Sequence, residues 1–301
     1  MDVTSLGQHR AVLSMRLPPN YLTSPKLTFD RDGARLIAVE SDAVVVCDIA
    51  RRETVRIDHA EACAALGFAD QIWIASHDEA LHRYTPMGAP MGEPLALPFA
   101  EHAMLVPGAC GPPTARWGDV VVHAEGTGGQ LVCTSLPPVD LALPITHRRF
   151  GIASWRSLLW PCGSATRFDA PITGGAVLDH GAQAVVVLGT GAARELALVG
   201  LADGRIATRI AVPTGILRIA RQCGLVVALV DPTTLVAIDL AADAVLGTMQ
   251  LARPTRDIAI DPRGTRIALR GAKVQILALE DLLYRSTTAT QPLARKLTRV
   301  A

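Results

Sequence analysis

The densest polar stretch of the sequence runs from Ser76 to His82 and contains two histidines, one aspartate and one glutamate. Side chains of these types could bind a metal ion. However, His77 and His82 lie five residues apart, which is not the i, i+4 spacing of a helical zinc pair. The stretch falls between two expected strands, and a zinc site usually needs at least three convergent ligands. We therefore interpret it as a solvated turn and predict no metal site.

The sequence contains no motif that predicts nucleophilic catalysis or phosphate binding. It lacks a GxSxG elbow. Its glycine-rich stretches at 126–129 and 189–191 are followed by expected strands, whereas a phosphate-binding loop opens a helix, so we interpret both as hairpin loops. His123 lies close to Glu125 in VVVHAEG, and the two could share one face of a strand; a histidine satisfied within that strand is the alternative. We predict no catalytic residues, no cofactor and no enzymatic activity.

Aromatic and arginine residues gather in the middle of the chain, where its repeat pattern is poorest. Such residues dominate the hot spots of protein interfaces. The alternative is that the tryptophans fill gaps between structural units. We predict an interaction surface that contains Trp117, His147, Arg148, Arg149, Phe150, Trp155 and Trp160.

Residues 286–301 form a basic C-terminal tail without any acidic residue. Leu293, Leu297 and Val300 follow the i, i+4, i+7 spacing of a short amphipathic helix that could dock on a partner. Disorder is the alternative, because short isolated helices are marginally stable. The basic residues added to the predicted interaction surface are Arg295, Lys296 and Arg299.

The elements that would position these residues are short apolar runs separated by Gly, Pro and Asp, which is typical of strands and turns. Residues 27–57 contain four such runs, LTFD, RLIAVE, AVVVCDI and TVRI, and the first three return near the C-terminus as RDIAI, RIALRG and AKVQILAL. Asp30 and Gly33 match Asp261 and Gly264 at the first turn of each unit. We interpret these four residues as turn makers, because Asp accepts backbone hydrogen bonds and Gly adopts positive φ.

A four-stranded meander is the unit of a β-propeller blade, and the units begin roughly 40 residues apart, as blades do. We predict an all-β fold in which residues 1–285 form one seven-bladed propeller, with six or eight blades as alternatives. The last unit has only three strands. Residues 11–18 supply a fourth, outer strand that would close the ring and remove the exposed edges of an open array.

The segment FDRDGARLIAVESDAVVVCDIARRETVRI resembles the bacterial WD40-like and YVTN-like propeller repeats. Its matching features are Asp32–Gly33 followed by Cys47-Asp48-Ile49, with similar stretches at 237–240 and 262–264. The GH and WD dipeptides of typical WD40 repeats are missing from the sequence. The resemblance implies a propeller with a binding role. Bacterial propellers of this kind are often fixed parts of multi-protein systems, including ATPase-linked ones.

The composition argues against nucleic acid and anionic membranes as partners and favours proteins. The net charge is +1 and charged residues make up 19% of the chain. Such a chain has no strong field to attract nucleic acid or an anionic membrane, and a surface poor in charge favours a lasting protein partner. We expect a cytoplasmic, non-catalytic interaction scaffold with protein partners. The alternatives are an enzyme centred on the channel and a sensor that binds a small molecule.

Overall fold

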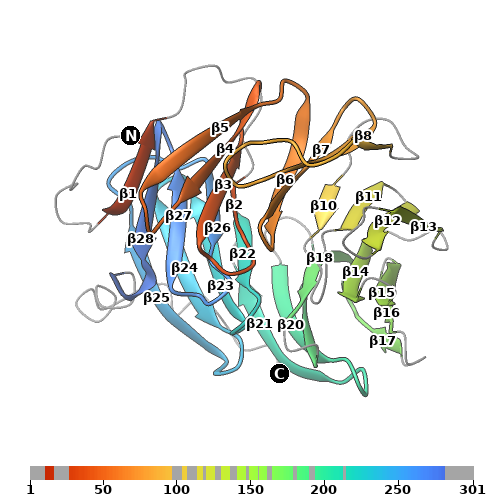
Figure 1. Cartoon of the computed structure of the whole chain (residues 1–301). Coiled ribbons are helices and arrows are strands. Elements are labelled where there is room, and N and C mark those ends of the chain that lie inside the picture. The colour runs from red at the N-terminus through yellow and green to blue at the C-terminus, as the bar shows by residue number, and fades with distance from the viewer. Residues whose placement is uncertain are drawn as a thin grey trace.

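The computed structural model is an all-β molecule, which confirms the predicted fold class (Figure 1). It describes residues 11–16, 27–96, 104–106, 114–117, 120–125, 130–135, 141–146, 149–154, 156–160, 165–178, 182–189, 194–212 and 215–281. For 11–16, 104–154 and 173–174 within these ranges, only the backbone is described. No helix within the described residues is long and apolar enough to cross a membrane.

The described strands form seven four-stranded antiparallel sheets, numbered here in chain order. Sheets one and two contain β2 (Leu27–Phe29), β3 (Arg35–Val39), β4 (Ala43–Asp48) and β5 (Glu53–Asp58), then β6 (Ala62–Phe68), β7 (Gln71–Ser76), β8 (Ala80–Tyr84) and β9 (Leu95–Ala96). Sheets three and four contain β10 (Met104–Val106), β11 (Thr114–Trp117), β12 (Val120–Glu125) and β13 (Gln130–Ser135), then β14 (Leu141–Thr146), β15 (Arg149–Ser154), β16 (Ser157–Leu159) and β17 (Ala165–Arg167).

The remaining sheets follow the same order of strands. Sheets five and six contain β18 (Ile172–Val177), β19 (Gln183–Leu188), β20 (Arg194–Gly200) and β21 (Ile206–Val212), then β22 (Ile216–Ala220), β23 (Leu225–Asp231), β24 (Thr234–Asp239) and β25 (Ala244–Gln250). Sheet seven contains β26 (Asp257–Ile260), β27 (Arg266–Arg270), β28 (Lys273–Ala278) and β1 (Ala11–Arg16).

Sheet seven joins the two ends of the described chain. Its strand order is β1-β28-β27-β26, so β1 is the outer strand, in the place that the sequence predicted for residues 11–18. The pairing is antiparallel and runs from Ala11 opposite Leu277 to Arg16 opposite Lys273. In Figure 1 the red strand near the N-terminus therefore lies beside the blue β28.

The core lies between neighbouring sheets, because the middle strands of sheets one, two, five, six and seven are apolar on both faces. In β19, for example, five consecutive residues from Ala184 to Leu188 are buried. Apolar clusters join sheet one to sheets two and seven, sheet six to sheets five and seven, and sheet four to sheet five. The first strands lie innermost in this arrangement, since β26 contacts both β2 and β22. Burial on both faces explains why these strands read as continuous apolar runs.

One strand differs from what the apolar runs predict. The run DLALPI at 140–145 is predicted as the last strand of a third unit that starts near His102, whereas β14 is the first strand of sheet four. The missing strand of sheet three is β11, a short stretch that follows Pro112 and Pro113. Its four residues, TARW, alternate too little between apolar and polar side chains for the sequence to indicate a strand. Sheet four therefore has four strands and is as complete as the others.

Candidate functional site: a belt of turns between sheets

The turn between β26 and β27 is organised by Asp261, which is 0% exposed. Its Oδ1 accepts hydrogen bonds from the backbone N–H groups of Thr265 (2.6 Å) and Arg266 (2.9 Å). Its Oδ2 accepts one from the Thr265 hydroxyl at 2.7 Å and faces Arg266 Nε at 3.5 Å. The buried carboxylate is thus satisfied by four donors, as a buried charge requires.

The turn between β2 and β3 repeats this design with fewer contacts. Asp30 is 3% exposed, and its Oδ1 accepts the backbone N–H of Arg35 at 3.1 Å. Its Oδ2 lies 3.6 Å from Arg35 Nη1. Burial raises the pKa of Asp30, because its hydrogen bond and ion pair with Arg35 compensate only part of the cost of removing the charge from water.

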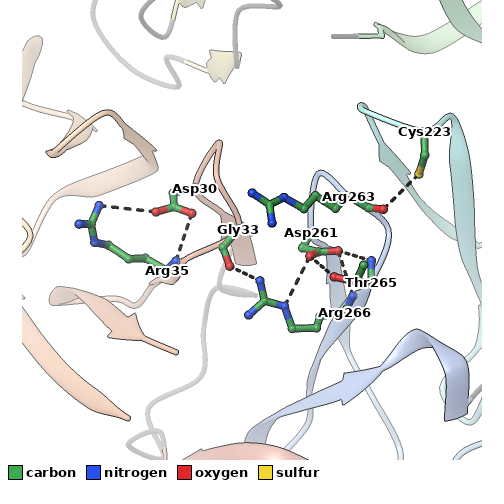
Figure 2. A network of polar contacts seen from close by, with 8 residues as sticks. All are labelled: Asp30, Gly33, Arg35, Cys223, Asp261, Arg263, Thr265 and Arg266. Carbon is green, nitrogen blue, oxygen red and sulfur yellow. Dashed lines mark hydrogen bonds and ion pairs between the residues drawn. The ribbon is translucent and has the colours of Figure 1, made fainter. Parts of the chain in front are cut away.

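The arginines five residues after these aspartates reach the next sheet, as Figure 2 shows for Arg266 and Gly33. Arg266 Nη2 donates to the Gly33 carbonyl at 2.5 Å, which ties sheet seven to sheet one. Arg35 donates to the Ala69 carbonyl at 3.4 Å and to Asp70 Oδ1 at 3.1 Å, which ties sheet one to sheet two. Each aspartate therefore both shapes its own turn and holds the arginine that reaches the neighbouring turn.

The first turn of sheet seven also contacts the first turn of sheet six. The backbone N–H of Gln222 donates to the Pro262 carbonyl at 2.9 Å, and Cys223 Sγ donates to the Arg263 carbonyl at 3.5 Å. Arg221 Nε donates to the Val177 carbonyl of β18 at 3.1 Å. These contacts connect the first turns of sheets five, six, seven, one and two. We name this series of turns the turn belt.

Two further features support the turn belt. Gly264 has a φ of 70°, and a Cβ at this position would lie only 2.8 Å from Cys223 Sγ. Glycine is therefore required both for the turn and for the approach of sheet six. Arginines also stack on neighbouring rings: Arg266 lies 5.9 Å from the centroid of Phe29, and Arg31 lies 5.9 Å from that of Phe68.

The side chains of the turn belt include a thiol and several exposed charges. Burial raises the pKa of the Cys223 thiol, which keeps it protonated and weakly nucleophilic at neutral pH. The belt nevertheless carries exposed charges of both signs, including Arg31, Asp32, Asp70 and Arg263. It is therefore a charged surface on a closely linked backbone.

The turn predicted for the stretch from Ser76 to His82 is confined to His77, Asp78 and Glu79, because Ser76 ends β7 and His82 lies within β8. His82 also contacts a residue from outside this stretch. His82 Nε2 lies 3.0 Å from Asp78 Oδ2, and its ring packs against that of His59 with centroids 4.5 Å apart. His59 Nδ1 lies 3.2 Å from the Tyr84 hydroxyl. In the described part of the chain, no group of three or more His, Cys, Asp or Glu residues is placed to hold a metal ion.

The structure describes only some of the predicted interaction residues. Trp160 is 1% exposed and packs between sheets four and five, where its Nε1 donates to Thr166 Oγ1 at 3.2 Å. It serves the core, which agrees with the alternative that tryptophans fill space between units, and it offers no surface to a partner. Trp117 ends β11, and Arg149 and Phe150 begin β15. The residues that lie outside the described part of the chain are His147, Arg148, Trp155, Arg295, Lys296 and Arg299.

The inner strands contribute one charged pair. Arg218 of β22 donates through Nη2 to Asp257 Oδ1 of β26 at 2.7 Å and through Nε to the Ile258 carbonyl at 2.9 Å. Asp257 Oδ2 also accepts the backbone N–H of Leu27 at 3.3 Å. This pair joins the first strands of three sheets, and its arginine side chain remains 38% exposed.

Comparisons with known proteins support a fold for this chain but identify no family. No family model matches the chain, and no curated protein matches it. Among solved structures, Kluyveromyces lactis Hsv2 is similar with a TM-score of 0.60 at 11% identity, over 82% of this chain and 90% of that one. Kluyveromyces marxianus Hsv2 has a TM-score of 0.59 at 9% identity, over 82% and 89% of the two chains.

Hydrazine synthase from Kuenenia stuttgartiensis is also similar, with a TM-score of 0.58 at 8% identity over 84% of this chain and 94% of that one. Identities this low carry information about the fold alone. Since Hsv2 is a β-propeller protein, these likenesses and the sheets described above show that the chain has a propeller-like all-β fold.

Proposed function

We propose that the protein is a non-catalytic interaction scaffold, a closed seven-bladed β-propeller whose turn belt is a docking face for a protein partner. Seven four-stranded sheets and the pairing of β1 with β28 support the closed ring. The resemblance to bacterial WD40-like and YVTN-like repeats supports a place in a bacterial, cytoplasmic multi-protein system, which we hold as part of the same proposal.

The observation that carries this proposal is the continuity of the turn belt. Contacts between sheets link the first turns of five consecutive sheets, from Val177 through Pro262 and Gly33 to Ala69. Binding requires that flexible groups be ordered, and this cost falls when the surface is already fixed. A linked row of turns with exposed charges therefore suits recognition of a partner that carries complementary charges.

Charge reversal on the turn belt tests the proposal. The double variant Arg263→Glu/Asp32→Arg changes two exposed side chains at the belt and leaves the net charge unchanged. We expect it to lose most of a partner captured by the wild type from the native host, as measured by quantitative mass spectrometry after affinity purification. Arg253→Glu is the matched control, since Arg253 is exposed on the loop before β26, at the opposite end of that strand. Equal capture by the wild type and the double variant would contradict the belt as the docking face.

The surface predicted from the middle of the chain needs a separate test. The double variant Arg149→Ala/Trp155→Ala removes two of its residues, and the C-terminal tail is tested by deleting residues 286–301. Loss of the partner in either variant, with retention in the charge-reversed belt variant, would move the docking face from the belt to that region.

A second candidate function, binding of a small ligand at the inner strands, is favoured by the pair Arg218 and Asp257. A guanidinium that is 38% exposed beside the channel-side strands could recognise an anionic metabolite. A thermal-shift screen of anionic metabolites tests this candidate, because a ligand that binds only the folded state raises its apparent stability. A hit that Arg218→Gln abolishes would favour the sensor or enzyme alternatives over a pure scaffold.

A further inference from the structure

His59 and His82 meet at the junction between sheets one and two, away from the turn belt. His59 follows β5, whereas His82 and Tyr84 belong to β8. The two imidazole rings are in edge contact with centroids 4.5 Å apart, and the Tyr84 ring centroid lies 6.1 Å from that of His59. These aromatic contacts connect the end of one sheet to the third strand of the next.

His59 is placed so that a second ring proton would be costly. Its Nε2 is buried and has no hydrogen-bond partner, and its Nδ1 shares one hydrogen bond with the Tyr84 hydroxyl at 3.2 Å. In the neutral ring Nδ1 can accept from this hydroxyl. In the charged ring both nitrogens are donors, so Tyr84 would have to reverse its role and Nε2–H would remain buried without an acceptor.

Two carboxylates near the histidine pair are engaged by groups other than the His59 ring. Asp78 contacts His82 Nε2 at 3.0 Å, so its carboxylate is engaged on the far ring. The backbone N–H of His59 donates to the Asp42 carbonyl, while the Asp42 carboxylate binds Arg56 at 2.7 Å. Burial lowers the pKa of His59, the neighbouring His82 lowers it further, and the carboxylates of Asp78 and Glu61 oppose this only in part.

Tyr84 also forms the base of the loop between β8 and β9, residues 85–94. It makes an isolated bridge with Pro90, and the loop closes on itself where the Thr85 N–H donates to the Ala89 carbonyl at 2.7 Å. The loop lies over β5, since a Cβ on Gly88 would lie 3.1 Å from Val55 Cγ1. At its tip Met87 is 68% exposed. The loop that carries this apolar tip therefore starts at a tyrosine whose hydroxyl is hydrogen-bonded to His59.

We propose that His59, His82 and Tyr84 form a pH-sensitive latch, which holds the β8–β9 loop against β5 while His59 is neutral and releases it when His59 is protonated. The latch does not depend on the scaffold function, because it concerns a different part of the molecule. It would make the exposure of the Met87 tip a function of pH near and below neutrality.

The sign of the effect follows from linkage. A histidine whose pKa is lower in the closed state than in the open state stabilises the closed state above its ordinary pKa, and that stabilisation is lost as the pH falls through the lower value. The opening equilibrium of the loop should therefore rise on acidification. The rise is limited to about tenfold for each unit by which closure lowers the pKa of His59.

Hydrogen exchange followed by mass spectrometry tests the latch in the full chain. We expect the protection of residues 84–96, corrected for intrinsic exchange rates, to fall between pH 7.5 and pH 5.5 in the wild type. His59→Gln should remove this dependence, whereas His77→Gln, an exposed histidine of the same sheet, should retain it. Protection of the wild type that does not change with pH, or a dependence that survives His59→Gln, would overturn the latch.

A second measurement guards against loss of folding in the variant. NMR titration of the wild-type histidine ring protons should give a lower midpoint for His59 than for free histidine in the same buffer, and Tyr84→Phe should raise the His59 midpoint. A His59 midpoint at or above that of free histidine would also overturn the proposal.

Discussion

The turns after β26 and after β2 share the spacing Asp-x-x-Gly-x-Arg but differ in how their aspartates are satisfied. Asp261 has four donors, one of them the Thr265 hydroxyl, whereas the corresponding position beside Asp30 is Ala34 and provides no hydroxyl. Both carboxyls are nearly inaccessible to solvent. The comparison teaches that one repeated motif can give both a well-compensated buried charge and an under-compensated one, depending on how many donors reach the carboxylate.

The largest effect should come from removing the two aspartates. Asp261→Ala leaves several buried donors without an acceptor, and we expect it to lower the free energy of unfolding by about 3 kcal/mol. Asp30→Ala leaves fewer donors behind and should cost about 1 kcal/mol. Urea denaturation followed by circular dichroism measures both, with the exposed Asp32→Ala as a control of small effect. Equal losses at the two sites would remove the proposed difference between the turns.

Substitutions of the arginines that follow these aspartates should lower the free energy of unfolding in the same order. Arg266→Lys loses the fork that bonds both Asp261 and the Gly33 carbonyl, and we expect a loss of about 1 kcal/mol. Arg35→Lys should cost less, because its partner Asp70 has a side chain 92% exposed and surface ion pairs contribute about 0–1 kcal/mol. The same unfolding experiment decides the order. A larger loss at Arg35 would show that sheet one is held to sheet two more tightly than to sheet seven.

The pH dependence of Asp30 offers a test without changes in packing. Burial raises its folded-state pKa above the ordinary value of 3.8. The stability contributed by such a group is fully present below 3.8 and is lost as the pH rises through the folded-state pKa. The stability of the wild type relative to Asp30→Asn should therefore decline as the pH rises across this window. A difference between the two proteins that stays constant with pH would show that Asp30 is as well compensated in the folded state as in water.

Exchanging the side chains that distinguish the two turns should change the free energy of unfolding by about 1 kcal/mol or less. Thr265→Ala removes one donor to Asp261 and should cost about 1 kcal/mol, whereas Ala34→Thr offers a new donor to Asp30 and should add about 0.5 kcal/mol. Both positions are exposed, so the exchange brings no clash in the core. The variant Ala34→Thr should also weaken the pH dependence of Asp30, which repeats of the titration would detect.

The sequence predicted the turns and strands better than it predicted the contacts between sheets. Asp30, Gly33, Asp261 and Gly264 could be recognised as turn makers because their local conformation depends on near neighbours. Nothing local to Arg266 indicates that its acceptor is Gly33, since that contact exists only once sheets seven and one lie side by side. The one sign in the sequence was the arginine five residues after each aspartate, repeated in both units.

The histidine pair was missed for a related reason. His77 and His82 drew attention as neighbours in a polar stretch, yet the ring that packs on His82 is His59, which belongs to a different sheet. Trp160 was misjudged because residue type alone does not distinguish a tryptophan of an interface from one in a core. Its burial against sheet five follows from the packing of sheets, which spacing within one unit does not show.

The pairing of β1 with β28 has a consequence for how the chain is made. Of the described strands, β1 is synthesised first and its partner β28 is synthesised last. The pairing edge of β28 therefore stays open until β1 reaches it. Contacts between residues so distant in sequence form slowly, because the intervening chain must be ordered first. The last sheet to be completed is therefore the one most exposed to pairing with another nascent chain.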